Sequence, residues 1–113
     1  MTGRPQWPGS PQMTSPAPIR LDAEELAIGD YYSGNYVKAA DLLTVLADSG
    51  TITSRGFFYL ACSRAAMVLV GAANQSGLAD ARVALSTAGN PAQFAADLKF
   101  ISPRVRQTLG IDK

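Results

Sequence analysis

Side chains that could carry out chemistry are few in this 113-residue sequence, which has one cysteine and no histidine. Cys62 could act as a nucleophile only if a base or a cation stabilised its thiolate. The commonest general base is absent, and Arg64, two residues further along a helix, would point to a different side. We therefore expect Cys62 to pack as a small buried hydrophobe.

The carboxylates do not form a catalytic or metal-binding pattern either. Glu24 and Glu25 stand together where a helix is expected to begin, and acidic side chains there favour the helix dipole. The aspartates are scattered, at spacings that suggest neither an acid–base pair nor a metal site. One cysteine cannot build a thiolate zinc site or an internal disulfide. The sequence therefore predicts a non-enzymatic protein with no metal and no cofactor, and it permits a reducing, cytoplasmic compartment.

The composition divides the chain into a tail and one domain. Apolar residues make up 47% and charged residues 17%, with a formal net charge of +1, so the total charge provides no strong attraction to nucleic acid or anionic lipid. Five of the seven prolines lie in residues 1–20, which we expect to form a Pro-rich, disordered tail, with the helical domain over 21–113. Alternatively, this tail is a short extended ligand that uses Trp7 between Pro5 and Pro8.

From residue 21 onward the apolar periodicity is helical, and no alternating segment indicates a strand. Asp22 and Glu25 have the spacing of a capping box, and Gly34-Asn35 is a strong turn signal. The chain is therefore predicted to be all-α. The expected helices span about 23–33, 36–48, 54–73 and 78–88, with short ones starting at Asn90-Pro91 and Ser102-Pro103.

The stretch "RGFFYLACSRAAMVLVGAANQ", residues 55–75, is consistent with a membrane span, a thiol site or the inner helix of a packed domain. Arg64 near its centre would cost about 2.5–3.5 kcal/mol in a bilayer. In water the helix has two apolar faces, which is typical of a central, buried helix. We therefore predict an inner helix and no membrane insertion, with Arg64 reaching an edge while its stem packs.

Two helix pairs in the sequence show internal similarity. Leu26-Ala27 and Leu60-Ala61 are 34 residues apart, and "AIGDYYSGNYVKAADLL" resembles the tetratricopeptide repeat (TPR) family. The segments "FYLACSRAAMVL" and "LADARVAL" resemble a second repeat. This resemblance implies a short TPR-like array of antiparallel helix pairs over residues 21–89, with C-terminal capping helices over 90–113.

The resemblance also implies a function, because the family consists mainly of scaffolds that bind proteins or peptides. The first helix of each pair lines the groove in such arrays. The expected function is a non-catalytic adaptor, although Tyr31 and Phe58 could equally be core residues. The partner-binding residues implied in this way are Glu24, Ile28, Tyr31, Arg55, Phe58 and Cys62.

Two other functions stay open. A self-assembling structural subunit is the first, because two repeats are fewer than a stable stack usually needs and the third helix is apolar nearly all round. Nucleic-acid binding through the basic C-terminus is less favoured, since it would require more basic residues with interleaved aromatics. A solvated face or a capping helix is the favoured explanation of this cluster, and an acidic partner surface is a further alternative. The basic residues of this cluster are Lys99, Arg104, Arg106 and Lys113.

Overall fold

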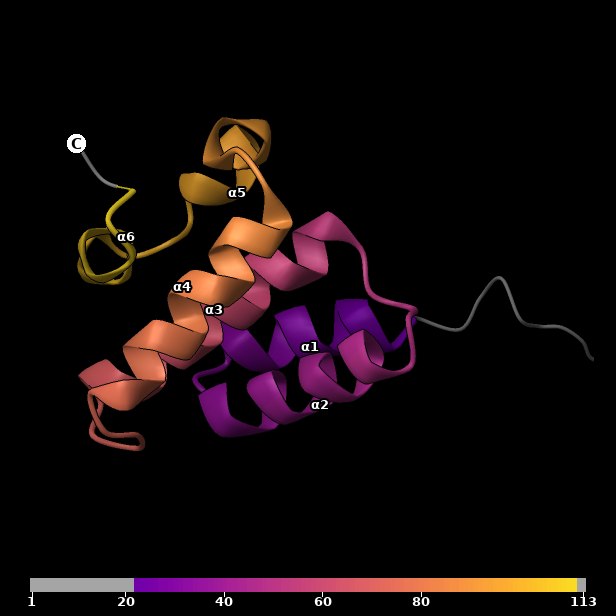
Figure 1. The fold of residues 1–113 in the computed structure, drawn as a ribbon, viewed down its shortest axis with the longest axis horizontal. Coiled ribbons are helices and arrows are strands. Elements are labelled where there is room, and N and C mark those ends of the chain that lie inside the picture. The colour runs from indigo at the N-terminus through magenta and orange to yellow at the C-terminus, as the bar shows by residue number, and fades with distance from the viewer. Residues whose placement is uncertain (1–21, 112–113) are drawn as a thin grey trace, which may run out of the picture.

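The computed structural model describes residues 22–111, and over this range the chain is helical with no strand, as predicted (Figure 1). The expected Pro-rich tail, residues 1–20, lies outside the described residues. The elements are α1 (Ala23–Tyr32), α2 (Tyr36–Asp48), α3 (Ser54–Leu69), α4 (Ser76–Ala88), the 3-10 helix η3 (Pro91–Phe94), α5 (Ala95–Leu98) and α6 (Pro103–Leu109).

Side-chain caps start α1, α3, η3 and α6 where the sequence predicts helix starts, whereas α2 and α4 have no side-chain cap and α4 begins at Ser76, ahead of the expected residue 78. Asp22 Oδ1 accepts the Glu25 N–H at 2.9 Å, which forms one half of the expected capping box. Asn90 and Ser102 likewise cap η3 and α6, each followed by proline at the first position. The cap of α3 is Thr53, whose Oγ1 accepts the Gly56 N–H. These caps satisfy backbone donors that have no partner inside the helix.

The third helix is shorter than expected, because α3 ends at Leu69 and not at Ala73. Gly71 has a φ of +80°, a left-handed conformation that glycine adopts at low cost. The Ala72 N–H then bonds back to the Met67 carbonyl at 2.8 Å, which closes the helix end. The apolar pattern continues through this turn, so periodicity alone could not locate the end.

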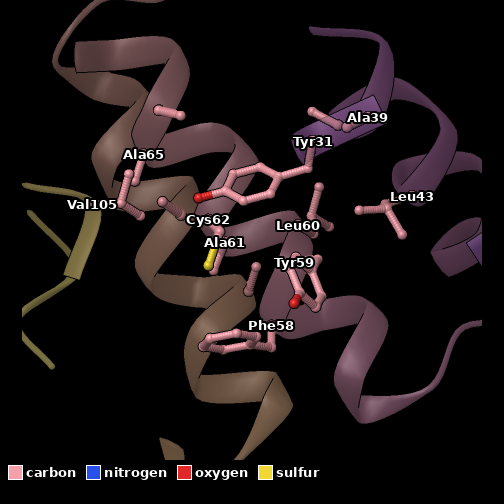
Figure 2. Packing of buried hydrophobic residues seen from close by; sticks show 14 of the residues in the cluster. Tyr31, Ala39, Leu43, Phe58, Tyr59, Leu60, Ala61, Cys62, Ala65 and Val105 are labelled. Carbon is pink, nitrogen blue, oxygen red and sulfur yellow. The ribbon is translucent and has the colours of Figure 1, made fainter. Parts of the chain in front are cut away.

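α3 is the central element of the fold. It contacts α1, α2, α4 and α6, and Figure 1 shows α4 lying along it. Phe58, Tyr59, Ala61 and Cys62 on α3 are fully buried, and the close-up in Figure 2 shows them among side chains from neighbouring elements. The prediction that this helix is internal is therefore confirmed. Within residues 22–111, no helix is long and apolar enough to cross a bilayer.

The two predicted repeats agree in their small residues and differ in their large ones. Ala27 and Ala61, 34 residues apart, are both fully buried. Leu26 is half exposed, whereas Leu60 is buried. In addition, α1 has 10 residues and α3 has 16, so the second helix pair is longer than the first. The 34-residue correspondence therefore holds where helices approach closely and fails at the adjacent leucines.

Replacing Gly29 and Gly56 with alanine should have opposite effects on stability. A Cβ at Gly29 meets nothing within 4 Å, so Gly29→Ala should raise the free energy of unfolding by about 0.5–1 kcal/mol. A Cβ at Gly56 would overlap the Glu24 carboxylate and Ile52 Cγ1, so Gly56→Ala should lower it by roughly 1–3 kcal/mol. Urea denaturation of both variants tests this difference, and equal shifts would contradict the packing described at Gly56.

Candidate binding site

An open hollow of about 440 Å³ lies where α1, α3 and the α5 segment meet. We call it the tyrosine hollow. It is lined by Tyr32, Arg55, Tyr59, Asp97 and Phe100. Three separate parts of the chain thus supply its side chains, which is typical of a site built by tertiary structure.

Asp97 is the centre of the hydrogen-bond network in the tyrosine hollow. Its Oδ1 accepts from the Tyr59 hydroxyl at 2.7 Å and from Arg55 Nη2 at 3.0 Å. Arg55 Nε lies 3.2 Å from Oδ2, so the guanidinium engages both carboxylate oxygens. The Asp97 side chain is only 16% exposed, and such charge-assisted bonds are stronger when they are partly buried. This network attaches α5 to α3.

The same network extends to α1 through two further contacts. Arg55 Nη1 pairs with Glu25 Oε2 at 3.1 Å, and the Tyr32 and Tyr59 hydroxyls are 2.6 Å apart. Because Tyr59 donates its single hydroxyl proton to Asp97, Tyr32 must be the donor in that contact. The Arg55 guanidinium also lies over the Tyr59 ring, 5.4 Å from its centroid. All three elements of the hollow are therefore joined by one continuous network.

The pKa shifts of Asp97, Arg55 and Tyr59 follow from burial and from the hydrogen bonds that these three groups share. Burial would raise the pKa of Asp97, but hydrogen bonds from Arg55 and Tyr59 outweigh burial and lower it. The hydrogen bond to Asp97 raises the pKa of Arg55, and burial raises the pKa of Tyr59. Near pH 7 these shifts favour a charged Asp97, a charged Arg55 and a neutral Tyr59.

Two aromatic rings form the exposed rim above this network. Phe100 is 73% exposed and Tyr32 is 47% exposed, whereas Tyr59 beneath them is fully buried. Exposed aromatic rings beside a paired arginine are the residue types that most often anchor protein interfaces. Such an arrangement can bind a ligand through ring contacts and hydrogen bonds without rearranging its floor.

Of the six residues predicted to bind a partner, only Arg55 lies in the tyrosine hollow. Glu24 instead accepts from the Thr53 N–H at 2.8 Å and the Thr53 hydroxyl at 2.7 Å, and so secures the start of α3. The other four side chains are at most 6% exposed and belong to the core; they are Ile28, Tyr31, Phe58 and Cys62.

The burial of these four residues has a common cause. Both apolar faces of α3 are covered, so Phe58 stacks on Phe94 with ring centroids 4.7 Å apart, and Tyr31 packs against Tyr59 at 5.6 Å. Figure 2 shows Tyr31 extending from α1 toward α3. Burial, and then the Asp97 charge, raise the pKa of the Cys62 thiol, which keeps it protonated. Cys62 therefore packs in the core, as expected from its residue type.

The sequence reasoning missed Tyr32, Tyr59, Asp97 and Phe100. Tyr59 offered one signal, because a tyrosine within a central helix needs a hydrogen-bond partner for its hydroxyl. Asp97 offered none, since it lies 42 residues from Arg55 and its own segment reads as a polar helix surface. Only the tertiary arrangement brings these residues together.

Three other hollows in the described range have at most one aromatic side chain each, whereas the tyrosine hollow has three. A second hollow, of about 530 Å³, lies between the start of α1 and the end of α2 and includes Leu26 and Leu46, but no aromatic ring lines it. No group of three or more potential metal ligands occurs in the described range 22–111. Arg106, part of the basic C-terminal cluster, bonds through Nη1 to the Leu98 carbonyl at 3.4 Å, which fits a capping role. Lys113 lies outside the described residues.

Comparison of the chain with protein-family models, with curated proteins and with solved structures gives no significant match.

Removing the Asp97 charge should lower the free energy of unfolding by an amount that depends on pH. The folded pKa of Asp97 lies below its unfolded value, so its stabilisation is complete above about pH 4–5 and is lost as the pH falls through the folded pKa. At pH 7, Asp97→Asn should lower the free energy of unfolding by roughly 1–3 kcal/mol. This difference from the wild type should shrink below about pH 4.

Glu25→Gln is the matched control, because the Glu25–Arg55 pair is about half exposed and should contribute at most about 1 kcal/mol. Denaturant titrations of the three proteins from pH 7 down to pH 2.5 measure both effects. A deficit in Asp97→Asn that stays constant with pH would contradict the assigned role of its charge.

Proposed function

We propose that this chain is a non-catalytic protein–protein interaction module, an adaptor or scaffold that binds a protein or peptide partner in the tyrosine hollow. One observation carries the proposal. Beneath the exposed rings of Tyr32 and Phe100, the partly buried Tyr59–Asp97–Arg55 network is formed entirely by the chain's own side chains. A preformed floor reduces the entropic cost of binding, and the rim rings supply apolar contact area.

The position of the hollow along α1 and α3 supports the TPR-like part of the proposal. We propose that α1–α2 and α3–α4 are two repeat units, with η3, α5 and α6 as the C-terminal cap. The first helix of each unit then faces the ligand, through Tyr32 on α1 and Arg55 on α3. The buried Ala27 and Ala61, one in each first helix, support the same pairing. In this scheme the partner contacts the face formed by Tyr32 and Arg55, which lies beside the core residues Tyr31 and Phe58 that the sequence had predicted to bind.

Self-assembly is the second candidate function. The sequence suggested self-assembly because the third helix is apolar nearly all round. In the structure other helices of the same chain cover α3, so this argument for a dimer loses force. Several large apolar side chains are exposed on other elements, among them Val45 on α2 and Val83 on α4. They lie on different helices, so they favour a dimer less than the tyrosine hollow favours a ligand. Nucleic-acid binding through Arg104 stays the least supported function.

We keep a cytoplasmic location as a prediction from cysteine usage, since a single buried thiol needs no oxidising compartment.

Selection from a displayed library of host-proteome peptides, followed by calorimetry with each selected peptide, tests the proposed function. Phe100→Ala should weaken peptide binding by about tenfold or more, because it removes a rim anchor. Its fold should be retained, since the ring is 73% exposed and has little packing to lose. Val83→Ala, which removes an exposed apolar side chain from α4, should leave the affinity unchanged.

The selection and the calorimetry also separate the alternatives. Peptides that bind equally well to the wild type and Phe100→Ala would place the site elsewhere. Failure to select any peptide, together with a dimer mass by light scattering, would favour the self-assembling subunit. Salt-sensitive binding of single-stranded oligonucleotides that is lost in Arg104→Glu would favour the nucleic-acid alternative.

A further inference from the structure

The tyrosine hollow and the Pro-rich segment of this chain have complementary chemistry. Residues 22–37 contain four carboxylates and no lysine or arginine, whereas residues 1–21 contain Arg4 and Arg20 and no carboxylate. Glu25, one of the four carboxylates, is half exposed and already pairs with Arg55 at the edge of the hollow. Glu25 and Asp97 carry two negative charges against the single positive charge of Arg55, so a basic ligand segment is attracted to this edge of the hollow.

The proline spacing fits an aromatic-lined site. Pro5, Pro8 and Pro11 recur every three residues, which is the period of a polyproline II helix, and in such a helix the three rings would share one edge. Proline-rich segments with this period dock between aromatic side chains, because a stiff extended chain loses little entropy on binding. Tyr32 and Phe100 are the two exposed rings of the hollow.

The length of the connecting segment is sufficient for docking within one chain. Residues 12–21, between Pro11 and the described start at Asp22, can span about 31 Å at ~3.1 Å per residue. Along α1 the distance from Asp22 to Tyr32 is only about 15 Å, at 1.5 Å per residue. The segment can therefore reach the hollow and reverse its direction on the way.

We infer that residues 4–11 of the chain bind in its own tyrosine hollow, with the rings of Pro5, Pro8 and Pro11 against Tyr32 and Phe100, and with Arg4 near the carboxylates of α1. This inference rests on the proposed function, since it assigns an internal ligand to the same surface. Because the ligand is tethered, it has a high effective concentration and competes with any external peptide. The segment thus acts as a built-in competitor that sets a threshold for partner binding.

Trp7 is the only tryptophan in the chain, so its fluorescence in the full-length protein reports this docking directly. Trp7 should be less accessible to acrylamide in the full chain than in a synthetic peptide of residues 1–20. Phe100→Ala, and separately the triple variant Pro5→Ala/Pro8→Ala/Pro11→Ala, should lower the ratio of docked to free segment by about tenfold or more. Pro16→Ala, outside the three-residue period, and Val83→Ala, away from the hollow, are the matched controls and should change nothing.

Three results would overturn the inference. The first is quenching of Trp7 in the full chain equal to that in the free peptide, and the second is protection of Trp7 that Phe100→Ala leaves unchanged. The third is protection that rises with protein concentration, because this would assign the segment to the hollow of a second copy. Failure of the inference differs from failure of the proposed function. If only the inference fails, Trp7 is fully accessible while selected peptides still bind in a Phe100-dependent manner. If only the proposed function fails, Trp7 is protected and no external peptide binds even to the triple proline variant.

Discussion

The burial of α3 on all sides is the constraint from which the rest of this structure follows. A helix whose two opposite faces both carry apolar side chains is stable in water only if neighbouring elements cover each of them. In this chain α1, α2, α4 and α6 do so, and small residues such as Ala61 and Ala65 allow these elements to approach closely. Unpaired buried polar groups are costly. The Ser63 hydroxyl of α3 has no hydrogen-bond partner among the described residues, whereas the Tyr59 hydroxyl has one.

Tyr59 shows how that requirement creates a surface as well as a core. Its ring packs in the interior, but its hydroxyl needs a hydrogen-bond partner, and it donates to the Asp97 carboxylate. Asp97 in turn needs a cation, which Arg55 from the first turn of α3 supplies. The hydrogen bond of buried Tyr59 to Asp97 thus explains why α5 packs against α3. Phe100, which follows α5 in the chain, lines the same hollow as Tyr32 for this reason. The candidate binding surface is a consequence of satisfying polar groups at the edge of the core.

The proposed function and the proposed internal ligand use different properties of that surface. Binding of a partner depends on the rigidity of the floor and on the exposed rings of Tyr32 and Phe100. Docking of residues 4–11 depends also on the proline period and on the opposite charges of the segment and of α1. An interaction module with a tethered competitor would respond only to partners above a threshold of affinity or concentration.

The sequence by itself determined the helical class, nearly all helix starts and the central place of α3, because caps, turns and apolar periodicity are local signals. It named Glu24 and Arg55 as binding residues, which stays a prediction, and it assigned Ile28, Tyr31, Phe58 and Cys62 to the same face. Only the tertiary structure decided that these four residues are core and that Asp97 meets Tyr59 and Arg55. The physical reason is that periodicity reports which side of a helix is apolar and carries no information on what covers it. A hydrogen bond between residues about 40 positions apart leaves no trace in local spacing.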